Sequence, residues 1–404
     1  MRLRDILFSL PFFGLLAHAT QAETLELYVD ADYSINAAAA QSIQMGFQTA
    51  LSQVDNRLGG LDVRLVPMDH RGNTKRSHRT MQNFLRSDNA LAMIGGIHSP
   101  PYLSYKDYIN ANRILTLLPW SAAGPVTRAS DGAENWIFRL SVDDTLSGEY
   151  LVRESVDRKG CSRVTLLLLD TGWGRANHKM LTNALARRNM TAVSVQFFSA
   201  AIGKASAKSL AQEVRQKRPD CAILLSNWDN GSQIVNTLHA ESVDVRIFSH
   251  WGIMGGQFAR NVPHNVRSDF GLSLLQTCWL RREKENNPVL ITALQDLAFD
   301  ADSLAQLPAP TGFVHGYDLA RVLIQAAAQV TDLPEWQGGD ITQRRRVLRS
   351  ALIDLKTPVD GILNRYDPPF RPYSRTQQDG HEALGADDLC MARFREDGLL
   401  EDAG

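Results

Sequence analysis

The sequence predicts an α/β protein built from two similar doubly wound domains, and three observations lead to this prediction. Short apolar runs that stop at Gly, Ser or Pro alternate with segments of helical spacing along most of the 404 residues. The runs are continuous, which is typical of parallel strands covered on both faces. The alternation also stops after residue 123 and starts afresh near residue 164, and a chain of this length is too long for one core.

In the first half, a strand–helix unit repeats three times. The expected strands cover residues 24–30, 61–68, 91–94 and 114–118. The expected helices end near residue 56 and cover residues 74–87 and the segment between the last two strands. Such repeats predict a right-handed parallel sheet with helices on both faces.

Two turns of small residues, at 95–101 and 119–123, follow neighbouring strands of this sheet. In open α/β sheets, ligands lie beyond the carboxyl ends of the strands. Backbone groups with little side-chain cover at that edge suit the binding of a small polar group.

The second half has the same plan. A short extended segment at 134–140 leads to a helix start at 141–144. The expected strands after it cover residues 164–170, 192–198, 221–226 and 245–249, with helices between them. Two similar α/β domains in one exported chain predict a cleft between them.

Export is predicted from residues 1–22. Arg2 and Arg4 precede an apolar stretch at 6–17, and cleavage is expected after Ala22 or Ala19, which is the pattern of a secretory signal peptide. A membrane anchor is disfavoured because the stretch is well short of about 20 residues. Because no cysteine follows the stretch, a lipid-anchored form is not expected.

The composition argues against nucleic-acid binding, since 43 basic and 44 acidic residues leave a net charge of −1. Catalytic motifs are missing too: the sequence has no G-x-S-x-G, H-E-x-x-H, C-x-x-C or P-loop. The pairs Asp69-His70 and Asp143-Asp144 are attributed to chance. The sequence therefore predicts a protein that is not an enzyme and has no cofactor or metal.

The four cysteines permit up to two disulfides in an exported protein. Cys161 and Cys221 each open an apolar run, and first and third strands are neighbours in a doubly wound sheet. This favours a Cys161–Cys221 pair and leaves Cys278 with Cys390. Four buried free thiols remain the alternative.

Five motifs together carry a family resemblance. They are I-G-G-I-H-S at 94–99, L-P-W-S-A-A at 118–123, F-R-L-S-V-D-D at 138–144 with Gly148 after it, T-G-W-G at 171–174 and H-G-Y-D at 315–318. With these motifs in this order and spacing, the chain resembles the type I periplasmic binding proteins, in particular the branched-chain amino acid and amide group that feeds ABC transporters. The resemblance covers nearly all of the mature chain.

The resemblance implies two Rossmann-like lobes joined by a three-crossing hinge. Lobe one would comprise residues 23–140 plus 280–358, and lobe two residues 141–279 plus 359–404. The crossings are expected near residues 139–144, 278–282 and 358–363. A helix at 311–330 would return to lobe one, and residues 387–395 would pair in lobe two.

For lobe one, the resemblance implies that Ser99, Trp120 and Ala122 hold the polar head of a ligand. Ser99 could instead be a helix N-cap. Ala122 stands where family members often have threonine, so one hydroxyl partner is missing. In lobe two no carboxylate for an α-ammonium is evident at His250-Trp251-Gly252, and Asp229 is either a substitute or a turn former.

Aromatic residues are expected to cover the rest of the ligand. Trp120, Trp173, Trp228 and Trp251 each follow a predicted strand, and Tyr33, Tyr102, Asn227 and His250 complete the candidate site. An aromatic cleft can stack a flat ring, enclose an apolar chain or cage a quaternary ammonium. Core packing is the alternative for any single tryptophan.

We therefore expect a periplasmic, monomeric solute-binding protein that captures an amino-acid-like, amide, aromatic or quaternary-amine compound for the permease of an ABC importer. The alternative is a periplasmic ligand-sensing subunit for a histidine kinase or chemoreceptor. Both roles use the same ligand-dependent closure.

Overall fold

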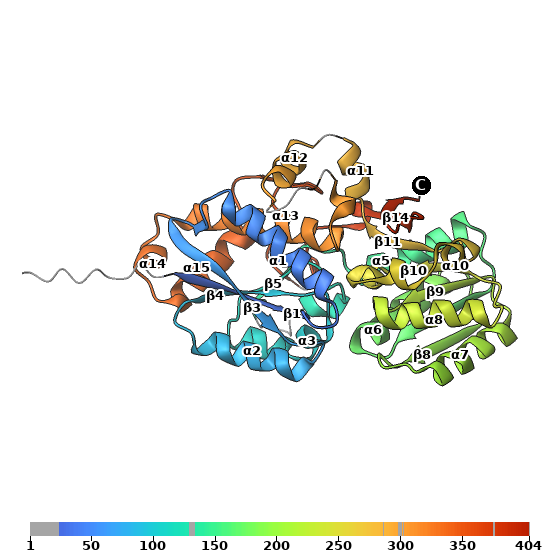
Figure 1. Cartoon of the computed structure of the whole chain (residues 1–404). Helices are drawn as coiled ribbons and strands as arrows, with labels where there is room; N and C mark the ends of the chain where they lie inside the picture. The colour runs from blue at the N-terminus through green and yellow to red at the C-terminus, as the bar shows by residue number, and fades with distance from the viewer. Residues whose placement is uncertain are drawn as a thin grey trace, which may run out of the picture.

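The computed structural model describes residues 24–128, 134–285, 287–297, 301, 303–374 and 376–403. The predicted signal peptide at 1–22 lies outside the described residues. The chain forms two lobes, each built around its own sheet (Figure 1). In Figure 1 the blue elements of lobe one lie together with orange helices from late in the chain, whereas lobe two is green and yellow and receives the red C-terminal strands. Each lobe is therefore discontinuous in sequence, as the resemblance implies.

The sheet of lobe one has six strands in the order β2-β3-β1-β4-β5-β6. Its strands are β1 (Leu25–Ala31), β2 (Arg57–Leu58), β3 (Leu61–Asp69), β4 (Ala90–Gly95), β5 (Thr116–Leu118) and β6 (Ile137–Arg139). All neighbours are parallel except β2 and β3. Every residue of the central strand β4 is buried, which explains its continuous apolar run.

Helices cover both faces of this sheet (Figure 1). Those of the first segment are α1 (Ala37–Ser52), α2 (Thr74–Arg86), α3 (Pro100–Ser104), α4 (Lys106–Ala111) and the 3₁₀ turn η1 (Gly124–Thr127). Those that return later are α13 (Pro310–Val330), α14 (Pro334–Gln337) and α15 (Ile341–Ile353).

Two glycines let α13 pack directly on α1. A Cβ at Gly46 would lie 2.3 Å from the carbonyl oxygen of Phe313, and one at Gly316 would lie 2.5 Å from that of Ile43. Any side chain at either position would push the helices apart. The return of residues 311–330 to lobe one therefore depends on close backbone contact.

The sheet of lobe two has seven strands in the order β15-β14-β11-β10-β9-β7-β8. Its strands are β7 (Val164–Leu169), β8 (Ser194–Phe198), β9 (Cys221–Leu225), β10 (Arg246–Ser249), β11 (Ser273–Thr277), β14 (Leu389–Phe394) and β15 (Leu400–Asp402). The first five along the chain pair in parallel, and β14 and β15 add antiparallel strands at one edge.

The helices of this lobe precede or connect its strands along the chain. They are α5 (Asp144–Val152), the π-helix η2 (Arg153–Arg158), α6 (Gly172–Ala186), α7 (Lys204–Lys217), α8 (Trp228–Ala240), the 3₁₀ turn η3 (Trp251–Gly255), α9 (Phe258–Asn261) and α10 (His264–Asp269). The remaining elements are α11 (Trp279–Lys284), α12 (Pro288–Gln295), η4 (Leu304–Gln306), the hairpin β12 (Val359–Asp360) and β13 (Arg365–Tyr366), and η5 (Ala386–Asp388).

The chain passes between the lobes three times. The first crossing joins β6 to α5, and the second leads from β11 through α11 and α12 to α13. The third runs beside the first: Arg139 N–H donates to His381 O at 2.9 Å, and Leu384 N–H donates to Leu140 O at 3.1 Å. The chain then enters lobe two at β14.

The expected position of the third crossing, residues 358–363, is wrong by about twenty residues. There the chain instead forms the β12–β13 hairpin, which is tied to α13 of lobe one. The buried Asp318 accepts hydrogen bonds from Ile362 N–H at 2.7 Å and Leu363 N–H at 3.0 Å. This carboxylate holds the hairpin against lobe one, so the boundary drawn at residue 359 is also too early.

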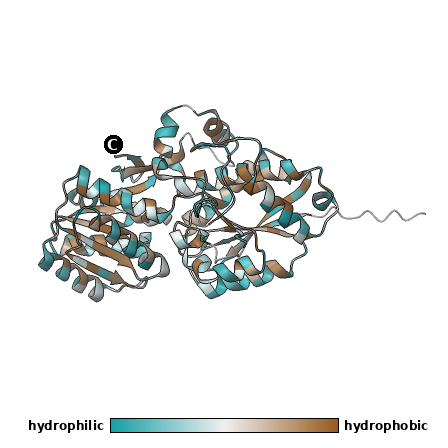
Figure 2. Cartoon of the chain, turned by 180° about the vertical axis from the view of Figure 1, so that it is seen from behind, coloured by the Kyte–Doolittle hydropathy of each residue, from teal (hydrophilic) through white to brown (hydrophobic). Residues whose placement is uncertain are grey.

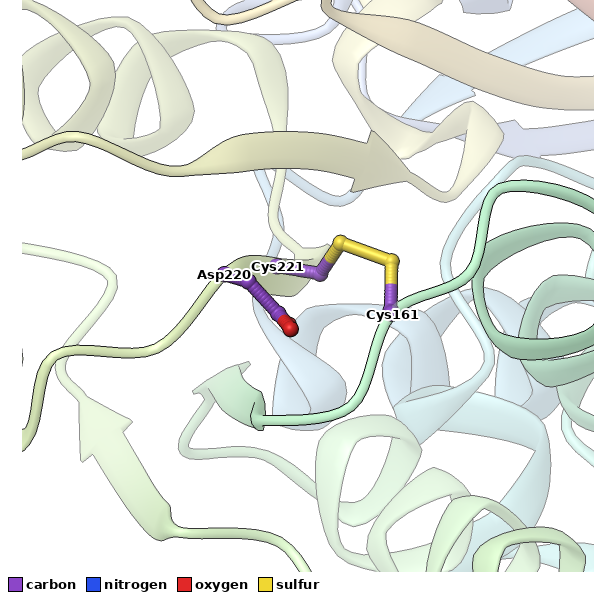
Figure 3. A group of neighbouring side chains, drawn as sticks. All are labelled: Cys161, Asp220 and Cys221. Atoms are coloured by element: carbon purple, nitrogen blue, oxygen red, sulfur yellow. A yellow bond between two sulfur atoms is a disulfide. The ribbon is translucent and has the colours of Figure 1, made fainter.

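Two disulfides join segments at the ends of neighbouring strands of lobe two. Cys161 and Cys221 have Cα atoms 5.9 Å apart, and Cys278 and Cys390 have Cα atoms 5.1 Å apart. Figure 3 shows Asp220 beside the first pair. Because both sulfurs are in the disulfide, this group of three offers no thiolate to a metal. The Asp220 carboxylate instead accepts hydrogen bonds from Ser162 and Arg163.

The hydropathy of the chain matches these layers. In Figure 2 the strands inside each lobe are mostly brown, and teal is concentrated on the outer helices. Among the described residues, no helix is both long and apolar enough to span a bilayer.

We expect the free energy of unfolding to fall as the pH is lowered from 7 to 4. Burial lowers the pKa of His70 to about 4 and of His315 and His381 to about 3. An unfolded histidine titrates near 6.5, so the unfolded state binds more protons below that pH and gains stability relative to the fold. Burial also raises the pKa of Asp30 and Asp318 to about 6, which acts in the opposite direction.

The effect of the three histidines exceeds that of the two aspartates, because the histidines are more numerous and their pKa values are more strongly shifted. Between pH 7 and pH 4 the free energy of unfolding should therefore fall by a net amount on the order of 3 kcal/mol. Urea denaturation at pH 7, 5.5 and 4 measures it. H381N keeps a donor for Ile137 O, which lies 2.9 Å from Nδ1 of His381, and should flatten the pH dependence. A protein that gains stability on acidification would contradict this prediction.

Candidate functional site

A cavity of about 280 Å³ lies between the two lobes, at the carboxyl ends of both sheets. Lobe one contributes the turns after β1, β3, β4 and β5, and lobe two those after β7, β8, β9 and β10. Its apolar wall consists of Ile35, Ile97, Pro100, Pro101, Ala122, Leu169, Trp173, Ala200, Ala201 and Trp251. The cavity is thus positioned as ligand sites are in open α/β sheets.

Ser99 links the two small-residue turns of lobe one. Its hydroxyl oxygen accepts a hydrogen bond from Ala123 N–H at 3.1 Å, and its side chain makes no N-cap bond to α3. Ser121 holds the same turns together by donating from its hydroxyl to Gly96 O or His98 O. Ser99 is nearly buried but lines the cavity, so its hydroxyl proton is available to an acceptor on a ligand.

A buried arginine supports this turn from beneath. Arg139 donates to the carbonyl oxygens of Ala122 and Ala123, both at 2.9 Å. Its guanidinium also pairs with Asp143 at 2.9 Å and Glu382 at 2.8 Å. Burial alone would lower the pKa of Arg139, but these two carboxylates outweigh it and raise the pKa above its usual range.

A second polar group of lobe one was not predicted. Asp32 accepts a hydrogen bond from the Asn36 amide at 2.9 Å and lies 3.2 Å from Nε2 of His98. Burial would raise the pKa of Asp32, but His98, Asn36 and the backbone N–H of Ile35 hold it below its usual range. Asp32, Asn36, His98 and Arg71 all line the cavity. The sequence offered one indication of these residues, because they lie in turns that follow strands at the same sheet edge as Ser99.

In lobe two, a buried aspartate organises the aromatic wall. Oδ2 of Asp144 accepts hydrogen bonds from Trp173 Nε1 at 2.8 Å and Asn177 Nδ2 at 2.6 Å, and Oδ1 lies 2.9 Å from His250 Nε2. Asp144 N–H also donates to Ala122 O at 2.9 Å. From the sequence, Asp143 and Asp144 were considered only as a catalytic pair, which missed this structural role, in which the two carboxylates hold elements on both sides of the first crossing.

The structure brings five of the predicted site residues to the cavity: Ser99, Ala122, Trp173, Asn227 and Trp251. The other five, Trp120, Tyr33, Tyr102, Trp228 and His250, are not among its lining residues. Asp229 lines the cavity, and the amide of Asn230 donates to its carboxylate at 3.0 Å.

Packing explains why two of these five are displaced. Trp120 is fully buried with its ring 6.4 Å from that of His315 on α13. The Tyr102 hydroxyl donates to Asp30 O at 2.8 Å and accepts from Gly96 N–H at 3.1 Å, beneath the turn. Both side chains point into the core of lobe one, so expecting them in the cleft was a mistake.

The remaining three have polar partners elsewhere. The Tyr33 hydroxyl donates to Gln44, and His250 pairs with Asp144. Trp228 donates from Nε1 to Ile35 O at 3.0 Å, which joins lobe two to lobe one near the cavity. Trp228 therefore bridges the lobes instead of lining the cavity.

Comparisons with known proteins agree with this architecture. A family model described as periplasmic binding protein matches residues 29–254. No protein of the curated set matches the sequence. Among solved structures, a type 1 periplasmic binding protein from Bordetella pertussis Tohama I superposes with a TM-score of 0.72 at 14% identity, covering 94% of this chain and 100% of that one.

Two further solved structures carry ligand names. A solute-binding protein of an ABC transporter from R. palustris, in complex with benzoate, has a TM-score of 0.70 at 15% identity and covers 94% of this chain and 96% of that one. A leucine-binding protein from Thermotoga maritima has a TM-score of 0.66 at 14% identity, with 94% and 98% covered. At these identities the likeness shows a shared fold.

Proposed function

This chain belongs to the type I periplasmic binding protein family, and from that premise we propose that it captures one small organic solute between its lobes for an ABC importer. The cavity of about 280 Å³, lined from both lobes, carries the proposal. The solute-binding role follows from the family. We further propose that a signal peptide exports the chain, that the ligand is a small organic compound delivered to an ABC importer, and that the ligand is released without chemical change.

The lining favours a solute with a polar end and a flat or apolar body. Ser99 offers a hydroxyl in lobe one, while the rings of Trp173 and Trp251 belong to lobe two. The volume of about 280 Å³ lies just below the usual range for ligand pockets of about 300 to 1,000 Å³, which suits a molecule of the size of an amino acid or an aromatic acid. The solved neighbours in complex with benzoate or named for leucine fall in this size class.

Closure of the lobes is the proposed binding mechanism. The Trp228–Ile35 hydrogen bond and the hydrogen bond from Asp144 N–H to Ala122 O each join elements of the two lobes. A ligand that contacts both sides of the cavity stabilises the closed form through its differential affinity for it. Closure also removes the ligand from water, so Ser99 then acts at a buried site.

A thermal-shift screen tests the proposal. We expect at least one compound among leucine, other amino acids, benzoate, 4-hydroxybenzoate, small amides and choline to stabilise the protein. A ligand at 100 times its dissociation constant adds about 2.7 kcal/mol. A best hit that is chemically converted during incubation, as judged by mass spectrometry, would rule out a pure binding role.

The serine variants locate the ligand. S99A should weaken the best hit by about 1 to 3 kcal/mol, because a buried polar group of the ligand loses its partner. S34A is the matched control, since the Ser34 hydroxyl donates to Asp69 outside the cavity. Equal calorimetric affinities for S99A and S34A would remove Ser99 from the site.

A further inference from the structure

A second cavity, of about 690 Å³, lies at the opposite end of lobe two. It opens where β10 and β11 begin, whereas the carboxyl end of β10 leads to the inter-lobe cavity. Its other walls come from η2, α10, β14 and β15 (elements labelled in part in Figure 1). Among the described residues, none lines both cavities.

The charges around this second cavity are unbalanced. Six basic and three acidic side chains line it: Arg158, Lys159, Arg246, Arg267, Arg393 and Arg395 against Glu154, Glu396 and Glu401. Arg158 pairs with Glu154 at 3.0 Å, Arg393 with Glu401 at 2.6 Å, and Arg395 with Asp397.

Three of the cations have no such partner. Within the part of the chain that the structure describes, no carboxylate lies within ion-pair distance of Lys159, Arg246 or Arg267. Three positive charges without an ion-pair partner therefore line one cavity, where Glu396 is the one lining carboxylate that forms no ion pair among the described residues.

Arg267 is the most informative of the three because it is buried. Only 4% of its surface is exposed, and its Nε and Nη1 atoms are buried without a hydrogen-bond partner. Its guanidinium carbon lies 5.6 Å from the ring centroid of Phe394, within the range of a cation–π contact. Native proteins pair buried charges because an isolated buried charge is costly. Among the described residues, these two nitrogens of the guanidinium have no hydrogen-bond acceptor.

Nearby acidic groups are already engaged. Burial lowers the pKa of Arg267, and the attraction of Asp397 offsets this only in part. Asp397 itself pairs with Arg395 and accepts from Leu399 N–H. Asp220 and Asp269 lie in the adjoining cavity and bind Ser162 and His239 respectively. Two carboxylates remain without an ion pair among the described residues: Asp244 in that adjoining cavity and the exposed Glu396 in this one. They leave an excess of positive charge on the Arg267 side.

We propose that this second cavity is an anion site in which Arg267, Lys159 and Arg246 hold a phosphate group. A guanidinium matches two phosphate oxygens with parallel N–H donors, and a multiply charged oxyanion balances three cations better than one carboxylate. Two sources carry such a group, a free phosphate in solution and a lipid headgroup, and the experiment distinguishes them. The site is separate from the solute cavity and does not rest on the proposed solute.

Titration calorimetry with inorganic phosphate in low-salt buffer tests the free anion, and co-sedimentation with phosphatidylglycerol vesicles tests the headgroup. We expect R267M to weaken the binding of inorganic phosphate, of the vesicles or of both by at least about tenfold, because the substitution removes charge-assisted hydrogen bonds. R260M is the matched control: Arg260 is an exposed arginine on α9 that does not line the cavity.

Binding of inorganic phosphate that depends on Arg267 identifies a free phosphate, and binding of vesicles alone with the same dependence identifies a headgroup. No binding in either arm, or equal binding by wild type and R267M, overturns the proposal. The exposed double variant K159M/R246M provides the same comparison without touching the buried side chain.

Stability separates a ligand site from a structural role of Arg267. In anion-free buffer, R267M should be at least as stable as wild type, because methionine replaces an unpaired buried cation. A marked loss of stability, with an unchanged response to phosphate, would show that the guanidinium is structural. Solutes found in the thermal-shift screen should bind R267M as they bind wild type, so failure here and failure of the proposed function are distinguishable.

Discussion

Replacing Arg139 with methionine is expected to lower the free energy of unfolding by about 3 kcal/mol or more, because it leaves two buried carboxylates without their main counter-ion. Asp143 and Glu382 have side-chain exposures of 2% and 4%, and that of Arg139 is 0%. Arg128 also pairs with both carboxylates, so the loss should lie near the lower end of the range for broken buried pairs. Urea denaturation followed by tryptophan fluorescence measures it.

R128M is the matched control. The Arg128 side chain is 26% exposed, so water partly screens its ion pairs and a loss of about 1 kcal/mol or less is expected. The triple variant R139M/D143N/E382Q should recover much of the stability lost in R139M, since no buried charge is left unpaired. Similar losses for R139M and R128M would contradict a buried network centred on Arg139.

R139M should also weaken solute binding. Arg139 holds the carbonyl oxygens of Ala122 and Ala123, and Ala123 N–H donates to the Ser99 hydroxyl. Loss of the guanidinium removes the support of the turn that carries this N–H. Calorimetry at a temperature where the variant remains folded separates this effect from the loss of stability.

Replacing Asp144 with alanine is expected to cost about 3 to 5 kcal/mol of stability, because it strands several buried donors at once. The carboxylate is the acceptor for Trp173 and Asn177 and lies within hydrogen-bond distance of His250. Trp173 lines the solute cavity, so its indole ring should lose its fixed orientation and the best solute should bind about tenfold more weakly.

D144N tests the charge separately from the shape. Asparagine retains one acceptor oxygen but presents an N–H₂ group to a neighbouring donor, so an intermediate loss is expected. D170A is the control, since Asp170 is exposed and its pair with Arg175 is at the surface. If D144A bound the solute as tightly as D170A, Asp144 would have no part in holding the aromatic wall.

The sequence was sufficient for the architecture because parallel strands buried on both faces read as continuous apolar runs. The runs in β4, β7 and β9, each fully buried, predict two doubly wound units. The place of the cleft follows from the same pattern, since every strand delivers its turn to one sheet edge. Ser99, Ala122, Trp173, Asn227 and Trp251 were placed at this edge, and all five line the cavity.

Which side chain of a turn faces the cavity was decided by contacts distant in sequence. Trp120 follows its strand just as Trp173 does, but it packs against Gly312 and His315, which belong to α13 almost two hundred residues later. A Cβ at Gly312 would lie 2.9 Å from the Trp120 ring. Local sequence carries no information about that neighbour.

Buried charges show most clearly which features the sequence determines and which the tertiary structure determines. The sequence shows Arg139, Asp143, Asp144 and Glu382 as ordinary charged residues, and only the tertiary fold brings the first and third crossings side by side and excludes water from them. Continuous apolar runs that alternate with helical segments therefore determined the two lobes and the cleft. The paired charges under the turns, the position of the third crossing and the unpaired Arg267 depend on burial, which arises only when distant segments pack together.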